Sequence, residues 1–284
     1  MRKQTKDIKK QLQSLNTLEE KINLLKDTYK GEGCYILTSG PSMKDYTSEY
    51  LREKLKNKLV IAVKQTYNIA PDIVDFHLLN TCNYQPYNYK DSKPIVMMVE
   101  IAGSTAKTPE LKPDLTLYID KTEASKEKSL SISLEYEKYL FTKSLKRPFG
   151  PGILHEIGIY LPILLGCKKI NIIGWDLGEP NNNEIKRFYE YSGIEKKIQK
   201  FIMDFSPSFY NRIYVRILNK INYIRYLLGS KNIVLNNPGI TIGEAKFIAE
   251  STKELYVWLK SKNIDMSIVS KNSMVDSIVP RFEL

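Results

Sequence analysis

Residues that build disulfides and metal sites are scarce in this chain. Its 284 residues include three cysteines, Cys34, Cys82 and Cys167, and two histidines, His77 and His155. Three widely separated cysteines provide neither a disulfide framework nor the ligand spacing of a zinc site, and two histidines exclude a histidine-rich metal centre. We therefore expect no metal. Cys34 and Cys167 are predicted to be small buried residues, and His77 to lie in the core.

Long apolar runs and paired carboxylates are missing as well. No run approaches the roughly 20 residues needed to cross a bilayer, and the N-terminal segment lacks the apolar centre of a secretory signal. The sequence therefore predicts a cytoplasmic protein. The chain has no Asp-x-Asp motif, which argues against a metal-dependent transferase that uses nucleotide-diphosphate sugars.

Positive charge is in excess, with 43 Lys and Arg against 32 Asp and Glu and a net charge of +11. Such an excess suits a polyanion, an anionic membrane surface or a phosphate-bearing substrate. The lysines are dispersed, and Arg and aromatic residues form no recognisable nucleic-acid module, so no nucleic-acid partner is expected. Residues 184–231 interleave Arg, Lys and Tyr with Ile and Leu. This pattern predicts a helical insertion that covers an active site, contacts an anionic membrane, or both.

Short apolar runs alternate with helical patterns over residues 31–284. The alternation predicts one Rossmann-like α/β domain with a mostly parallel sheet flanked by helices. Strands are expected at 34–37, 59–67, 73–80, 94–101, 115–119, 170–174, 232–237 and 266–270. Helices are expected at 45–56, 133–141, 153–165 and 241–262, with Pro162 kinking the third of them.

Residues 1–30 are expected to add an N-terminal helix to this domain. Its helical pattern runs over 3–30, where apolar residues recur at three- and four-residue spacing at Leu12, Leu15, Leu18, Ile22 and Leu25. Such a stripe either packs on its own domain or forms an oligomer contact.

The turn Ser39-Gly40-Pro41-Ser42 follows the first predicted strand. Gly40 permits a close backbone approach, Pro41 restricts the turn, and the hydroxyls of Ser39 and Ser42 can bind phosphate or ribose. Because ligands of open α/β sheets bind at the carboxyl ends of strands, this turn is a candidate nucleotide-binding loop. The alternative is an ordinary strand-to-helix turn.

A second polar unit spans residues 147–176. Arg147 and the turn Gly150-Pro151-Gly152 precede an apolar helix, and the following strand ends in Gly174-Trp175-Asp176. In a βα unit these two turns belong to the same ligand-facing edge as the serine turn.

Four segments, in this order, are similar to the bacterial family 42 sialyltransferases, which transfer a nonulosonic acid from its CMP donor. They are the strand and Gly-Pro-Ser loop at 34–43, Asn80 at a strand end, the unit at 147–176, and the Asn236-Asn237 turn. The Gly-Pro-Ser loop and the G-x-D strand end also resemble the 6-hydroxymethylpterin pyrophosphokinase-like domain. That domain is shared by archaeal pterin enzymes and flagellin-modifying motility accessory factors.

The resemblance implies a GT-A-like sialyltransferase variant of the Rossmann fold. By analogy, the donor would be bound without a further cofactor. Ser39, where the family has Asn, would line its phosphate and ribose with Gly40, Pro41 and Ser42. Gln65 and Asn80 would also bind the donor, and Lys64 would stand in place of a family asparagine. Gly150, Pro151 and Gly152 would replace a Thr-Ser-Gly turn of the family. Gly174 would bind the donor beside Asp176, and Asn236 and Asn237 would lie on the cytosine side.

The chain departs from this family at the catalytic base, which is a histidine before the last strand in the sialyltransferases. Residues 184–231 contain no histidine, and alignment brings Tyr210 or Asn211 to that place. A carboxylate is the natural substitute, since it can act as a base or a nucleophile. Asp176 is the first choice, unless it only caps its turn or binds ribose, and Glu100 and Glu179 follow.

Three basic side chains complete the candidate catalytic and binding set. Lys64 and Arg147 can offset phosphate charge as a nucleotide leaves, or they are solvated at the surface. His155 is structural, faces phosphate, or acts as a base.

These features together predict a glycosyltransferase that moves sialic acid, pseudaminic acid or Kdo from a CMP-activated donor to a bacterial surface glycan or glycolipid, as in lipooligosaccharide or capsule biosynthesis. The alternatives are an ATP-dependent pyrophosphokinase-like enzyme and a non-catalytic protein that binds glycan or membrane. The expected partners are the donor, the acceptor, an anionic membrane at the inner face of the cell membrane, and a further copy of the chain.

Overall fold

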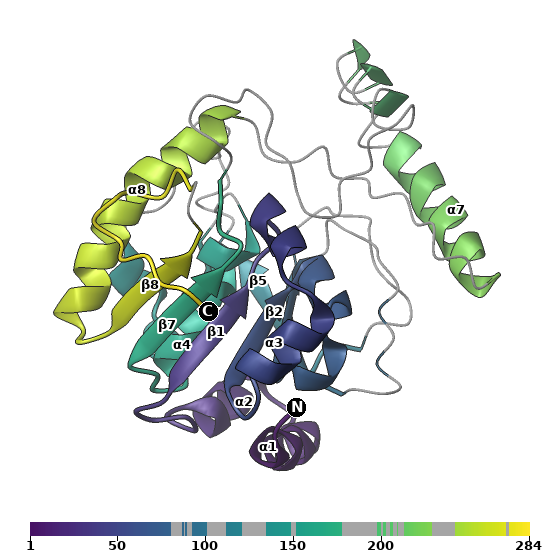
Figure 1. Cartoon of the computed structure of the whole chain (residues 1–284). Coiled ribbons are helices and arrows are strands. Elements are labelled where there is room, and N and C mark those ends of the chain that lie inside the picture. The colour runs from purple at the N-terminus through teal and green to yellow at the C-terminus, as the bar shows by residue number, and fades with distance from the viewer. Residues whose placement is uncertain are drawn as a thin grey trace.

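Eight strands pair in parallel and form one sheet in the computed structural model of the chain (Figure 1). Their order is β6-β5-β4-β3-β2-β1-β7-β8. The bounds are β1 Gly33–Leu37, β2 Leu59–Val63, β3 Phe76–Asn80, β4 Ile95–Glu100, β5 Leu115–Ile119, β6 Lys146–Arg147, β7 Lys169–Ile173 and β8 Asp265–Val269. The predicted Rossmann-like α/β fold is confirmed.

The structure describes residues 1–80, 87, 89, 93–100, 112–120, 135–148, 152–177, 198–199, 201–202, 205–206, 209, 213–228, 242–270 and 273–284. Several expectations concern residues outside these ranges. They are the strand at 232–237 and the roles of Cys82, Gly150, Pro151, Glu179, Tyr210, Asn211, Asn236 and Asn237.

The direction of the chain across the sheet reverses at β1. Strands β2 to β6 extend the sheet on one side of β1, whereas β7 and β8 extend it on the other. The boundary between β1 and β7 is therefore a topological switch point, the place where open α/β sheets bind ligands. Leu37 and Ile173 pair at the carboxyl ends of these two strands.

Helices cover both faces of the sheet, as parallel strands with apolar residues on both faces require. The helices α1 (Lys3–Ser14), α2 (Leu18–Leu25), α4 (Tyr160–Leu164) and α8 (Ile242–Ser261) share one core with the sheet. Helix α3 (Ser48–Lys54) contributes Leu51 to a second core that also holds Val60 and Ala62 of β2. Cys34 and Cys167 are buried, as predicted.

The expectation of one helix over 3–30 is wrong, because the segment forms two helices. Leu15 is extended, and Thr17 starts α2 with a capping box. The Thr17 side chain accepts from the Glu20 amide at 3.2 Å, and the Glu20 carboxylate accepts from the Thr17 amide at 2.9 Å. This Thr-x-x-Glu signal is visible in the sequence and outweighs the continuous apolar spacing.

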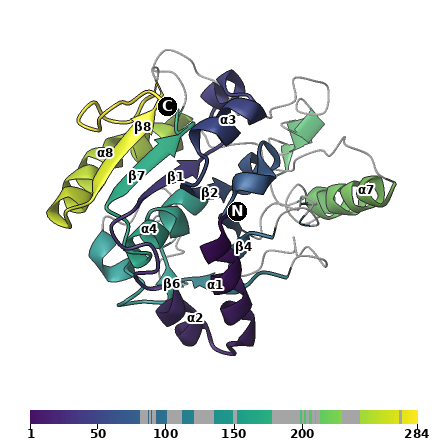
Figure 2. The same cartoon turned by 60° about the horizontal axis from the view of Figure 1, so that its bottom comes forward.

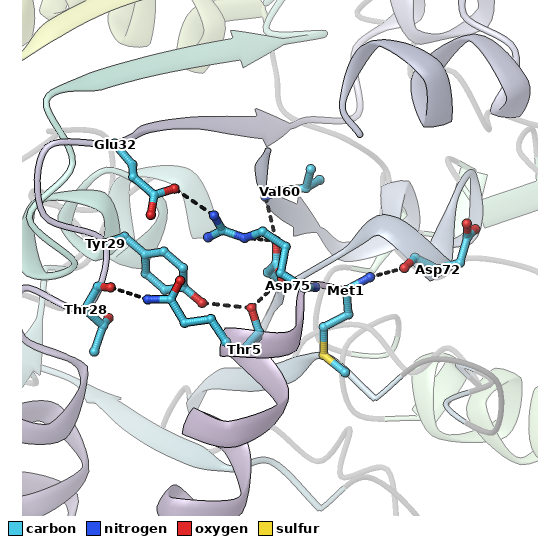
Figure 3. A network of polar contacts seen from close by, with 10 residues as sticks. Met1, Thr5, Thr28, Tyr29, Glu32, Val60, Asp72 and Asp75 are labelled. Atoms are coloured by element: carbon cyan, nitrogen blue, oxygen red, sulfur yellow. Dashed lines mark hydrogen bonds and ion pairs between the residues drawn. The ribbon is translucent and has the colours of Figure 1, made fainter. Parts of the chain in front are cut away.

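A buried polar network joins α1 to the amino edge of the sheet (Figure 3). Asp75, just before β3, accepts from Thr5 Oγ1, from the Val60 amide at 3.1 Å and from the Arg2 amide at 3.0 Å. The Arg2 guanidinium donates to Glu32 at 2.7 Å and lies 4.3 Å from the centre of the Tyr29 ring. Helix α1 therefore packs on its own domain, at the edge opposite the strand ends that would hold a ligand.

The strand predicted at 73–80 begins at Phe76, after a 3-10 turn over Pro71–Ile73. Two other predicted boundaries shift for local reasons. The strand predicted at 59–67 ends at Val63, because Lys64 takes a left-handed φ of 52° and Thr66 Oγ1 accepts from the Val63 amide at 3.0 Å. The helix predicted at 153–165 contains a π-helical turn over Leu154–Gly158 before α4, and the Ile159 amide donates to Leu154 O at 2.9 Å. Pro162 has no N–H to donate to the carbonyl of Gly158, which favours an irregular turn there.

The remaining helical expectations are met less fully. The predicted helix at 45–56 is shorter than expected, since Pro41–Asp45 is a 3-10 turn and α3 starts after Thr47. In the stretch predicted to be helical at 133–141, Tyr136–Tyr139 forms a short 3-10 helix. Among the helices in the described ranges, none is both long and apolar enough to cross a membrane.

Candidate functional site

The serine turn after β1 and the acidic turn after β7 are bonded to each other at the switch point. The Ser42 amide donates to Asp176 Oδ2 and the Ser42 hydroxyl donates to Asp176 Oδ1, each at 2.8 Å. The Gly40 amide donates to Gly174 O at 2.8 Å. Two turns that are far apart in the sequence thus form one rigid unit.

Both glycines of this unit lie where a larger residue has no room for its Cβ. A Cβ on Gly40 would lie 2.3 Å from Asp176 Oδ2 and from Gly174 O. A Cβ on Gly174, whose φ is +76°, would lie 2.6 Å from Thr38 O. Gly40 was expected to let the backbone approach a ligand, and the neighbours that the structure describes for it are instead the backbone and carboxylate of the second turn.

Asp176 is buried, and both of its carboxylate oxygens accept hydrogen bonds from Ser42. These contacts match the turn-capping alternative for this residue. Ser39, Gly40, Pro41 and Ser42 are half-buried, so the outer side of their turn meets solvent.

The end of β2 places Lys64 and Gln65 beside the switch point, because β2 pairs with β1. Lys64 has an exposed fraction of 9%, so the alternative that it is a solvated surface residue is wrong. Its backbone carbonyl accepts from His77 Nε2 at 2.8 Å. This hydrogen bond from β3 thus stabilises the left-handed turn at Lys64.

His77 is a core residue, as predicted. Since Nε2 donates to a carbonyl, Nδ1 is the acceptor and takes a hydrogen bond from the Tyr89 hydroxyl at 2.8 Å. The ring stacks on Tyr67 with centroids 4.6 Å apart. Burial lowers the pKa of His77 to about 3, which keeps it neutral.

Four buried polar atoms near this edge have no hydrogen-bond partner within the described part of the chain. They are Gln65 Oε1 after β2, Asn80 Oδ1 at the end of β3, and His155 Nε2 and Glu156 Oε2 in the π-helical turn. A buried polar atom without a partner costs about 1–3 kcal/mol, and native proteins rarely leave several together. These atoms make this edge of the sheet the candidate ligand site.

Glu156 was missed by the sequence analysis. Burial raises the pKa of its carboxyl to about 7, whereas the positive charge of Lys64 acts to lower it. The π-helical turn that carries Glu156 also packs against β2, the strand that Lys64 follows. A lone glutamate within the apolar run 153–165 was the signal that could have identified it.

His155 precedes Glu156 in the π-helical turn, and its ring lies near Trp175 of the acidic turn. Its ring centroid is 5.7 Å from that of Trp175, and burial lowers its pKa to about 4. Gly152, with a φ of +142°, lies just before the π-helical turn. Its carbonyl accepts from the His155 amide at 3.0 Å and from the Glu156 amide at 3.2 Å.

Arg147 lies elsewhere, in β6, which is five strand spacings from β1, or about 24 Å across the sheet. Its guanidinium is completely buried, donates to Tyr139 O at 2.8 Å and to Ser144 O, and lies 4.1 Å from the centre of the Phe141 ring. The surface-solvation alternative is therefore wrong here too. Glu100, at the end of β4, is three strands from β1.

The residues brought together are therefore those that follow β1, β2 and β7 and Asn80 at the end of β3, with the π-helical turn beside them. No group of three or more His, Cys, Asp or Glu in the described ranges is arranged to hold a metal ion.

The fold and this edge define a Rossmann-like α/β protein with a polar site at its topological switch point. No family model and no curated protein matches the chain. Among solved structures, the chain is similar to the structure of MAf glycosyltransferase from Magnetospirillum magneticum AMB-1, at 14% identity and a TM-score of 0.31. The match covers 64% of this chain and 30% of that one, so the chain spans less than a third of that protein's length.

Proposed function

We propose that this protein is a glycosyltransferase that moves a nonulosonic or octulosonic acid from a CMP-activated donor to a bacterial surface glycan. The proposed donor sugars are sialic acid, pseudaminic acid and Kdo. The observation that carries the proposal is the group of partnerless buried polar atoms beside the joined turns of β1 and β7. The structural neighbour bears the name of the same class of enzyme, and the match is too distant to add weight.

The chemistry of the site suits a nucleotide sugar. Gln65 Oε1 and Asn80 Oδ1 are acceptors without donors in the described ranges. Sugar hydroxyls and the exocyclic amine of cytosine supply such donors. The half-buried serine turn offers hydroxyls to phosphate or ribose, and the buried Lys64 offers a positive charge to the phosphate.

Glu156 is the base in this proposal, and Asp176 positions the serine turn. Both oxygens of Asp176 are occupied by Ser42, whereas Glu156 Oε2 has no partner in the described part of the structure. A carboxyl with a pKa of about 7 exchanges its proton near neutral pH. The acceptor hydroxyl would attack the anomeric carbon and give its proton to Glu156, while the bond to the phosphate oxygen breaks and CMP leaves.

Isothermal titration with CMP, together with a donor-hydrolysis assay, tests this function. We expect Gln65→Ala to weaken CMP binding, and Glu156→Gln to keep CMP binding while abolishing transfer and hydrolysis of the CMP-sugar. The absence of both heat and thermal shift at millimolar CMP would refute the donor assignment. A preference for ATP with Mg²⁺ would instead favour a pyrophosphokinase-like enzyme, and CMP binding without turnover of any CMP-sugar would favour a non-catalytic protein.

A further inference from the structure

Helix α7 (Val215–Leu227) stands apart from the layers of the sheet in both views (Figures 1 and 2). Large apolar side chains along it and beside it are exposed. Their exposed fractions are 47% for Ile213, 51% for Ile217, 40% for Ile221, 55% for Ile224 and 80% for Leu228. Single exposed apolar residues are ordinary on a protein surface, but five along one helical segment are not.

These five residues share one face of the helix. They recur at three- and four-residue spacing, so at about 100° per residue they lie within an arc of about 80°. Leu218, which is buried, points away from this arc. We call the arc formed by Ile213, Ile217, Ile221, Ile224 and Leu228 the apolar stripe of α7.

Cations flank the apolar stripe on both sides. Arg216 and Lys220 are exposed on one side, and Arg225 is half-buried on the other. The sequence contains no Asp or Glu from residue 205 to residue 243, so the segment that carries these cations has no acidic residue of its own. A narrow apolar face between basic margins is the pattern of a helix that lies in a membrane interface.

A second run of exposed apolar residues precedes α7 in the chain. Exposed fractions are 45% for Ile198, 70% for Phe201, 83% for Phe205 and 45% for Phe209, again at three- and four-residue spacing. The rings of Phe201 and Phe205 stack with centroids 6.2 Å apart. Aromatic and aliphatic side chains of this kind insert at the boundary between headgroups and acyl chains.

We propose that the apolar stripe of α7 docks on an anionic phospholipid bilayer, with Arg216, Lys220 and Arg225 at the headgroups. Charge decides between this occupant and a second copy of the chain. Two copies meeting through this face would bring cationic margins together, with no carboxylate on α7 to pair with them. An anionic surface complements those margins, and the inference does not depend on the proposed transferase activity.

Co-sedimentation of the full chain with vesicles tests the proposal. We expect binding to vesicles that mix phosphatidylglycerol with phosphatidylcholine, little binding to pure phosphatidylcholine, and weakening at high salt. Arg216→Gln/Lys220→Gln should weaken binding roughly thirtyfold, at about 1 kcal/mol per cation. Ile217→Glu/Ile224→Glu should abolish it.

Matched controls come from exposed residues elsewhere on the molecule. Lys246→Gln/Lys253→Gln removes two exposed cations of α8, and Val257→Glu/Ile278→Glu adds the same charges at exposed apolar positions. Both controls should bind like the unmodified chain, and thermal melting should show that all four variants fold.

Three outcomes would overturn the proposal. They are no binding to the anionic vesicles, equal loss of binding in the test and control variants, and dimers in analytical ultracentrifugation that the Ile217→Glu/Ile224→Glu variant dissociates. CMP titration of the same samples distinguishes the two proposals. A protein that binds vesicles but does not bind CMP would refute only the donor assignment.

Discussion

Ser42 donates both its amide and its hydroxyl hydrogen to the carboxylate of Asp176, across 134 positions of sequence. A carboxylate that accepts two such bonds is a strong, directional partner. The pair joins the ends of β1 and β7 where the strand order reverses, and so it determines the shape of the edge at which ligands of this fold class bind.

The first prediction concerns the contact between the two turns. Gly40→Ala should destabilise the protein by about 1–3 kcal/mol, because its Cβ would lie 2.3 Å from Asp176 Oδ2 and Gly174 O. Urea denaturation measures the loss. Gly33→Ala is the control, since its Cβ would meet its nearest atom at 3.4 Å, and equal stability of the two variants would contradict the prediction.

The second prediction concerns the coupling of Ser42 and Asp176. Ser42→Ala removes one bond to the carboxylate, and Asp176→Asn replaces an oxygen that accepts with an amide that donates. Each variant should lose about 1–3 kcal/mol of unfolding free energy. In the double variant the losses should fall short of their sum by at least about 0.5 kcal/mol. Additive losses would show that the two residues act independently.

The third prediction is a pH dependence of stability that comes from Glu156. Its pKa rises from 4.5 in the unfolded chain to about 7 in the folded one, mainly through burial. Between these values the unfolded chain has lost the proton and the folded chain retains it, so this group reduces stability as pH rises from about 4.5 to 7. Over that range the reduction reaches roughly 3 kcal/mol.

Glu156→Gln isolates this contribution. We expect the difference in unfolding free energy between this variant and the unmodified chain to change with pH across the same window, in favour of the variant at higher pH. Urea denaturation at several pH values measures it, with Glu254→Gln on the exposed side of α8 as the control. A difference that is constant with pH would contradict the burial of an ionisable carboxyl.

The fourth prediction concerns the two histidines. Burial lowers the pKa of His77 to about 3 and that of His155 to about 4, so both should remain neutral across about pH 5.5 to 8. The imidazole NMR signals should keep the shifts of neutral rings over that range. The signal that is lost in the His155→Asn variant belongs to His155, and the remaining one belongs to His77. A midpoint near the ordinary value of 6.5 for either ring would place that histidine in contact with solvent.

The histidines also oppose Glu156 in the pH dependence. A histidine with a lowered folded pKa contributes stability that is present above about pH 6.5 and is lost as pH falls toward its folded value. The unmodified protein should therefore show a flatter profile than Glu156→Gln, in which only the histidines contribute a slope in this region.

Much of the fold could be predicted from local pattern. Apolar runs located β1, β4, β5, β7 and β8 to within one residue at each end, since buried parallel strands must be apolar on both faces. Elements that depend on short polar features were missed more often. Strand β6 has two residues and no apolar pattern, and the break at Thr17 depends on one capping box.

The strand ends that form the candidate site could be predicted, but the contacts between them could not. Glycine and serine after an apolar strand indicated the ligand edge, because backbone geometry makes those residues useful there. Nothing local indicated that Arg147 would be wholly buried against Phe141, or that Glu156 would lie near Lys64. The burial of Arg147 depends on how the segment from Tyr139 to Ser144 wraps around it, and the position of Glu156 on how the π-helical turn packs against β2.

The sequence by itself determined most of the strands, the turns that follow them and the basic, apolar character of residues 213–228, since each follows from residue type and spacing alone. Only the tertiary structure decided that Lys64, Arg147 and Glu156 are buried and that both oxygens of Asp176 are occupied. Burial and hydrogen bonding depend on neighbours that are distant in the chain, and those neighbours also set the pKa of Glu156.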